Sequence, residues 1–221
     1  MSENGSVRIT RLIMGPVVIT LCITLLRLWG ELHHWNSVLF NSNAGGAGAI
    51  VGIAWLPFIF GPYFAWKLAA AGERPSGSGK VILFAVVGLL VVVGGSVVAF
   101  QSSPGAFSGK VLAGELLMVA AAMIQFMAWG TFAKTLLAYA FAARVPVAIV
   151  MFYAIRGGWG THYDALPPGY AGPTDFLGKY VAIALVPQFI FWIAYTMIIG
   201  ALVGGVILAI SGRGKVVAQA A

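Results

Sequence analysis

The sequence predicts an all-α integral membrane protein that forms one polytopic domain over residues 1–221, and three observations lead to this prediction. Of the 221 residues, 60% are hydrophobic and 9% are charged, whereas soluble domains are about 45–50% apolar and about 25% charged. The mean hydropathy is +0.95. Apolar runs of about 20 residues, the length that crosses a bilayer, recur along the chain. This composition excludes a soluble globule, and the single cysteine, Cys22, excludes an intramolecular disulfide.

About six apolar segments are predicted to span the membrane, and a polar outer loop is predicted at 157–179. The spans are expected at about 12–32, 48–71, 81–100, 111–133, 136–156 and 181–210. The fifth segment contains Arg144, and a central arginine costs about 2.5–3.5 kcal/mol on insertion scales. We therefore expect either a fifth crossing with Arg144 near its inner end, which we prefer, or five spans and a re-entrant segment over 145–156.

The charges of the loops predict a cytoplasmic N-terminus. In the six-span arrangement, nine of the 13 lysines and arginines fall on the inner side, as the positive-inside rule requires. The re-entrant arrangement gives the same count, so the rule does not decide between the two. The first apolar run is too long for the core of a signal peptide and is expected to stay uncleaved. The Gly, Ala and Val content is compatible with a bacterial inner membrane.

A stripe of polar residues follows one face of the first span. At 100° per residue its members fall within an arc of about 80°; they are Thr20, Thr24, Arg27, Glu31 and His34. Arg27 and Glu31 are one turn apart and can pair, which lowers the cost of placing both in a membrane. The stripe is either a neutralised anchor at the interface or one wall of a polar pocket.

The fourth span carries a second stripe over a similar arc: Glu115, Met118, Ala122, Gln125 and Trp129. An unpaired amide in hydrocarbon is unfavourable, so Gln125 is expected either to bond a neighbouring helix or to lie on a polar path from the outer face. Two Gly-x-x-x-Gly patterns, at 48–52 and 200–204, are expected to mark close helix packing.

The three histidines, His33, His34 and His162, are expected at the outer side together with Asp164. Imidazole and carboxylate groups could bind a divalent transition metal there, although no ligand-spacing motif is present. The metal and any cofactor stay unknown, and no histidine lies at mid-membrane depth to ligate a haem. Signatures of soluble enzymes are absent, so no catalytic residue is named and the question of enzymatic activity stays open.

These patterns predict an outward-facing polar pocket that binds or passes a small solute, ion or proton. The ligand-binding residues predicted for it are Arg27, Glu31, His34, Glu115, Gln125, His162 and Asp164. Two alternatives stay open: a structural or assembly subunit of a membrane complex, and a metal-dependent membrane enzyme with an outer-face site. The expected partners are the lipid bilayer and either a second copy or another membrane protein. Nucleic acid is excluded despite the net charge of +7, because the basic residues are dispersed.

Overall fold

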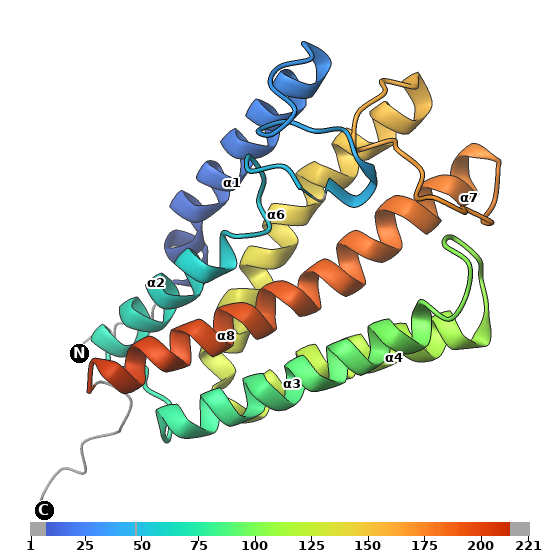
Figure 1. The fold of residues 1–221 in the computed structure, drawn as a ribbon. Coiled ribbons are helices and arrows are strands. Elements are labelled where there is room, and N and C mark those ends of the chain that lie inside the picture. Colours follow the sequence, from blue (N-terminus) through green and yellow to red (C-terminus); the bar gives the residue numbers. More distant parts are fainter. Residues whose placement is uncertain (1–7, 47, 213–221) are drawn as a thin grey trace, which may run out of the picture.

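The computed structural model describes residues 8–46 and 48–212, and this part of the chain is all-helical, as predicted (Figure 1). Five stretches are long and apolar enough to cross a membrane: Ile9–Leu32, Ser78–Ala99, Gly109–Ala128, Gly130–Gly157 and Phe176–Ile210. They correspond to helices α1, α3, α4 (Gly109–Met123) with α5 (Gln125–Ala128), α6, and a last helix in several parts. A sixth main helix, α2 (Pro57–Ala70), has 14 residues.

The helices run back and forth between two ends of a bundle. We call the end where α1 begins and the last helix finishes the near end, and the opposite end the far end (Figure 1). The loops at 33–56, 100–108 and 158–175 lie at the far end, with the short helix η1 (Ala44–Gly46) in the first of them. The described ends of the chain therefore share one side, the arrangement expected for six passes.

The second predicted span differs from the structure in its first half. Residues 48–56 form an irregular segment, and α2 begins at Pro57, because proline fits the first turn of a helix, where its missing N–H is not needed. At about 1.5 Å per residue, 14 residues cover about 21 Å, less than the roughly 30 Å hydrocarbon core. The chain thus enters this pass as a loop and completes it as a short helix.

The two Gly-x-x-x-Gly patterns have different outcomes. Gly48 lies in a loop with φ +82°, so close helix packing at 48–52 was a wrong prediction. Gly200 packs against Gly61 of α2, where an added Cβ on Gly61 would collide with the Gly200 backbone. The prediction for 200–204 is therefore confirmed, and it explains how α2 lies tightly on the last helix.

The predicted boundary between the fourth and fifth spans also moves. The chain reverses at Trp129, whose extended backbone (φ −158°, ψ 92°) separates α5 from α6. Helix α6 then runs unbroken through Pro146 for 28 residues, so 145–156 is not a separate re-entrant segment. Arg144 lies at the middle of this helix, and the expectation that it lies near an inner end was wrong.

The last helix departs from α-helical geometry within its first half. It begins as α7 (Phe176–Tyr180), continues through the π-helical segments η2 (Val181–Leu185) and η3 (Pro187–Phe191), and ends as α8 (Trp192–Ile210). Such π-helical turns are rare and concentrate at functional sites. This stretch brings the buried Gln188 opposite α6.

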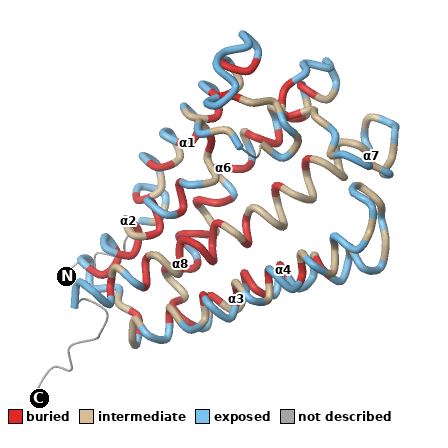
Figure 2. The backbone as a smooth tube through the Cα atoms, viewed as in Figure 1, coloured by how far each residue is buried: buried red, intermediate tan, exposed pale blue. Residues whose placement is uncertain are grey.

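The core lies along α6 and the last helix. Their most apolar windows are 50% and 61% buried, against 22% in α1 and 28% in α3. Figure 2 shows buried residues on the inward faces and exposed residues on the outward faces of the bundle. The outward faces carry large apolar side chains such as Leu90, Ile149 and Val97, and lipid is the solvent that such faces require. The chain is therefore in contact with the bilayer.

Candidate ligand-binding cavity

A cavity of about 540 Å³ occupies the far half of the bundle. Its walls come from α1, the loop at 44–54, the α3–α4 loop, α4, α6, the loop after α6 and the π-helical stretch. Pockets for small molecules usually measure about 300–1,000 Å³ and combine apolar walls with a few convergent polar groups. The polar side chains on this wall include Arg27, Glu115, Arg144, His162 and Gln188.

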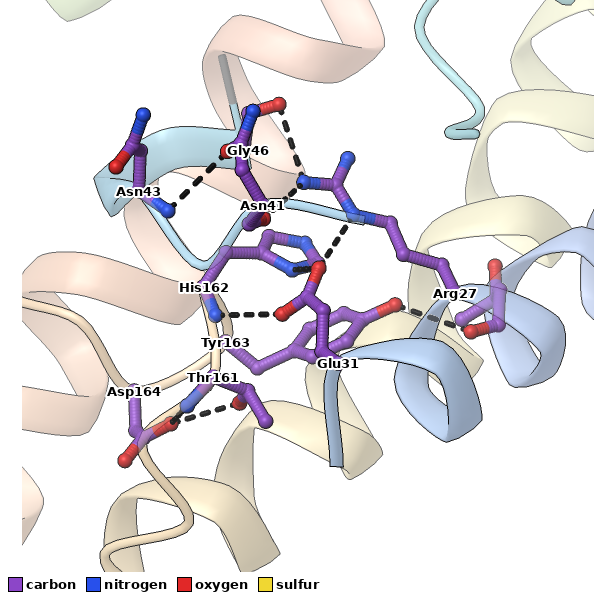
Figure 3. A network of polar contacts seen from close by, with 10 residues as sticks. Arg27, Glu31, Asn41, Asn43, Gly46, Thr161, His162, Tyr163 and Asp164 are labelled. Carbon is purple, nitrogen blue, oxygen red and sulfur yellow. Dashed lines mark hydrogen bonds and ion pairs between the residues drawn. The ribbon is translucent and has the colours of Figure 1, made fainter. Parts of the chain in front are cut away.

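A buried ion cluster, defined as Arg27, Glu31 and His162, is shown in Figure 3, and two of its members, Arg27 and His162, lie on the cavity wall. The Nε of Arg27 donates to Oε1 of Glu31 at 2.7 Å, and the Nδ1 of His162 lies 2.6 Å from the same oxygen. The backbone N–H of His162 donates to Oε2 of Glu31 at 2.8 Å. The predicted pairing of Arg27 with Glu31 is thus confirmed, and His162 joins it from a segment 131 residues away.

The ion cluster is largely buried, and hydrogen bonds connect its charged groups to one another and to the backbone. The side chain of Glu31 is 0% exposed and that of Arg27 is 7% exposed. The Nη2 of Arg27 also donates to the carbonyl oxygens of Asn41 and Gly46, both at 3.2 Å. A buried pair of ions is tolerated when additional hydrogen bonds satisfy both partners. The cluster therefore joins the loops at 33–56 and 158–175 to the far end of α1.

The protonation of His162 follows from its partner. An ionised carboxylate only accepts hydrogen bonds, so Nδ1 carries the proton that is shared with Glu31. Burial lowers the pKa of His162 below its usual value, and the charge of Arg27 lowers it further, although the bond to Glu31 opposes both effects. Nε2 is the ring nitrogen of His162 that is not bonded to Glu31.

The neighbours of His162 hold the loop in place. Asp164 accepts hydrogen bonds from the backbone N–H groups of Gly160 and Thr161 and from the Thr161 hydroxyl, at 2.7–2.9 Å (Figure 3). The Tyr163 hydroxyl donates to the Thr24 carbonyl at 3.1 Å, and burial raises the pKa of Tyr163. Asp164 thus shapes the turn that presents His162, and its carboxylate faces the backbone of its own loop.

Arg144 on the cavity wall has a different environment from Arg27. It is 4% exposed, and its Nη1 donates to Oε1 of Gln188 at 3.2 Å. Its Cζ lies 4.6 Å from the centroid of the Trp192 ring. Its Nε is buried with no hydrogen-bond partner, and no carboxylate of the described residues is within ion-pair distance. The prediction of site residues omitted Arg144, although a charge inside an apolar run was a visible signal.

The other predicted site residues do not gather at one place in the structure. Glu115 of α4 lies on the cavity wall. Gln125 lies apart from the cavity and donates from Nε2 to the carbonyl oxygens of Phe84 and Ala121, so it bonds helix to helix. His34 follows the end of α1, has φ 51° and is exposed, so it does not extend the polar stripe. The stripe of α1 ends at Glu31.

The histidines and Asp164 do not converge on a metal. The Nδ1 of His33 pairs with the Trp29 carbonyl oxygen of its own helix, and His162 turns to Glu31. Within residues 8–46 and 48–212, no group of three or more His, Cys, Asp or Glu side chains is placed to hold a metal ion. The metal-dependent alternative therefore gains no support from this arrangement.

Fold and cavity together define a class: a multi-pass α-helical membrane protein with a cavity in one half of its bundle. Comparisons with protein-family models, with curated proteins and with solved structures find no match. The function must therefore be argued from the cavity and its residues.

Proposed function

We propose that this membrane protein binds a small solute in the far-end cavity. The observation that carries the proposal is the cavity itself: about 540 Å³, largely apolar walls, and a few charged groups on them. Three of the residues predicted from sequence, Arg27, Glu115 and His162, lie on its wall, and Glu31 is bonded to Arg27 and His162.

Binding is favoured over passage through the molecule. The lining residues of α1, Ile23, Thr24 and Arg27, belong to the last ten residues of that helix, and those of α4 to its first ten. The near half of the bundle is filled by packed side chains such as Phe64, Phe132 and Leu208, all less than 2% exposed. Among the described residues, the lining of the cavity therefore does not extend into the near half.

The assembly-subunit alternative relies on the exposed apolar faces of the outer helices. Lipid covers such faces equally well, so they do not favour a protein partner.

The proposal can be tested with a photoreactive, diazirine-bearing dodecanol in nanodiscs, with crosslinks mapped by mass spectrometry. Val147 is 5% exposed and lines the cavity, whereas Ile149, two residues along α6, is 53% exposed on the outer face. Val147→Phe should fill the cavity and reduce labelling of residues 182–192 several-fold. Ile149→Phe, which adds the same ring outside, should leave this labelling unchanged.

A second filling variant covers the case in which Val147→Phe fails to fold. Ala182→Phe fills the cavity from the wall formed by the last helix and should also reduce labelling of the α6 residues. Labelling confined to outward-facing residues such as Leu90, or insensitive to both filling variants, would contradict the proposal.

A further inference from the structure

We propose that Arg144 is the head-group receptor of the cavity, and that the solute is an amphipathic monoanion with an apolar body and a carboxylate head. This inference rests on the proposed function, because it requires that the cavity hold a solute. It adds the chemical class of that solute and the residue that selects it.

The first argument is the unbalanced charge of Arg144. An arginine is always charged and presents five N–H donors, yet Arg144 has one hydrogen bond to a neutral amide and one contact with an aromatic ring. It lies at the middle of a 28-residue helix, where a charge is most unfavourable. Charged side chains at this depth usually pair with one another or mark the path of a substrate or ion.

Arg27 is a buried arginine whose charge and N–H donors find partners within the protein. It has a carboxylate partner and two carbonyl acceptors in addition. Arg144 has a buried Nε without a partner and a place on the cavity wall. The missing carboxylate of Arg144 is thus expected to come from the cavity, where it can accept a charge-assisted hydrogen bond from the guanidinium.

The charges around the cavity limit the anion to one negative charge. The positive charge of Arg27 is already balanced by Glu31, and Glu115 adds a negative charge to the same wall. A phosphate monoester carries about −1.5 to −2 at neutral pH and would need a second free cation. A carboxylate needs only Arg144.

The apolar walls of the cavity define the rest of the solute. Around Arg144 the lining includes Val147, Met151, Ile183, Ile190 and Phe191. A chain or ring of hydrocarbon suits this surface, because burying apolar area against apolar walls is favourable. Gln188 and Trp192, which also line the cavity, hold the guanidinium in place.

The test compares two competitors that share a body and differ in the head. Dodecanoate and dodecanol are titrated against cavity labelling by the photoreactive dodecanol in nanodiscs, at alkaline pH where the acid is ionised. Dodecanoate should compete at least about tenfold more strongly than dodecanol, because a hydrogen bond to a charged group exceeds one to a neutral group. Concentrations are corrected for partition of each competitor into protein-free nanodiscs.

Arg144→Gln should remove this preference and bring dodecanoate to the level of dodecanol. Arg156→Gln is the matched control, because Arg156 is an exposed arginine on the same helix, and it should keep the wild-type preference. The comparison on the wild-type protein needs no variant, so it stands even if Arg144→Gln does not fold.

The outcomes separate the two proposals. Competition by both compounds without a head-group preference, or a preference that survives Arg144→Gln, would overturn the role of Arg144 and leave the cavity as a binding site. Failure of the photoreactive probe to label the cavity at all would overturn both.

Discussion

At the residue scale, two buried arginines in one chain have opposite surroundings. Arg27 is enclosed by acceptors that belong to the protein, and its carboxylate partner Glu31 receives three donors. Arg144 has a neutral amide and an aromatic ring. We therefore expect Arg27 to stabilise the folded protein and Arg144 to recognise the solute.

Glu31→Gln should destabilise the protein by about 3–5 kcal/mol, because it leaves the buried charge of Arg27 without its counter-ion. The free energy of unfolding in detergent micelles measures this. Glu115→Gln is the control, since Glu115 has no ion pair among the described residues, and it should change stability by less than about 1 kcal/mol.

A double variant refines this prediction. Arg27→Gln combined with Glu31→Gln removes both charges and should be more stable than Glu31→Gln alone. If the double variant loses the sum of the two single losses, the two side chains are not coupled.

Because His162 is buried, we expect the folded protein to lose stability in mild acid. Its pKa is lowered by burial in the folded state, so between the unfolded value of about 6.5 and the folded value the unfolded chain binds more protons. Stability should therefore fall as the pH falls through this window, by at most about 1.4 kcal/mol per pH unit for one proton. The readout is the thermal midpoint as a function of pH.

His162→Gln removes the titrating group and should flatten this part of the pH profile relative to the wild-type protein. An unchanged slope in the variant would assign the effect to another group.

At the element scale, glycine sets how closely α3 and α4 approach. An added Cβ on Gly95 would lie 2.7 Å from the carbonyl oxygen of Gly114, whereas one on Gly94 would meet nothing within 4 Å. The two glycines are neighbours on one helix, about 100° apart around its axis, and only Gly95 faces α4.

Gly95→Ala should lower the free energy of unfolding by about 1–3 kcal/mol, because the backbone of α4 must move away. Gly94→Ala should be neutral or stabilising by up to about 1 kcal/mol, because alanine is the better helix former. Equal effects of the two changes would mean that the close contact is not a feature of the folded protein.

Sequence patterns predicted the elements that are long and uniformly apolar, and missed those decided by single residues. The predicted spans at 12–32 and 81–100 agree closely with the bounds of α1 and α3, because each is one unbroken apolar run. The turn at Trp129 carries only one adjacent glycine as a signal. Pro146 lies in the segment 145–156 that was considered as re-entrant, and α6 passes through it. A proline inside a helix is tolerated where neighbouring groups compensate for the lost bond.

At the scale of the whole molecule, the ion cluster shows what sequence alone could not give. The four-residue spacing of Arg27 and Glu31 made their pairing predictable, since it follows from the period of a helix. Nothing local indicated that His162 would complete the cluster, because it approaches through tertiary packing of a loop. The stripe on α1 pointed to a polar wall, and the cavity beside it required the fold.

The arrangement of passes predicts that the near and far ends lie on opposite sides of the membrane, and the charges of the loops predict that the near end is the cytoplasmic one. In a Cys22→Ser background, the single substitutions Ser76→Cys and Leu166→Cys place one exposed thiol at each end. An impermeant maleimide applied to intact cells should label Leu166→Cys and spare Ser76→Cys until the membrane is opened. Labelling of both in intact cells would contradict the six-pass arrangement.

The central claim is that the far-end cavity binds a solute, and the most direct measurement is the ratio of cavity labelling in Val147→Phe to that in Ile149→Phe with the photoreactive dodecanol. The two variants add the same ring to the same helix, inside and outside the cavity. The account predicts a ratio well below one at residues 182–192. A ratio of one, with both variants folded, would show that the probe does not enter the cavity and would contradict the account.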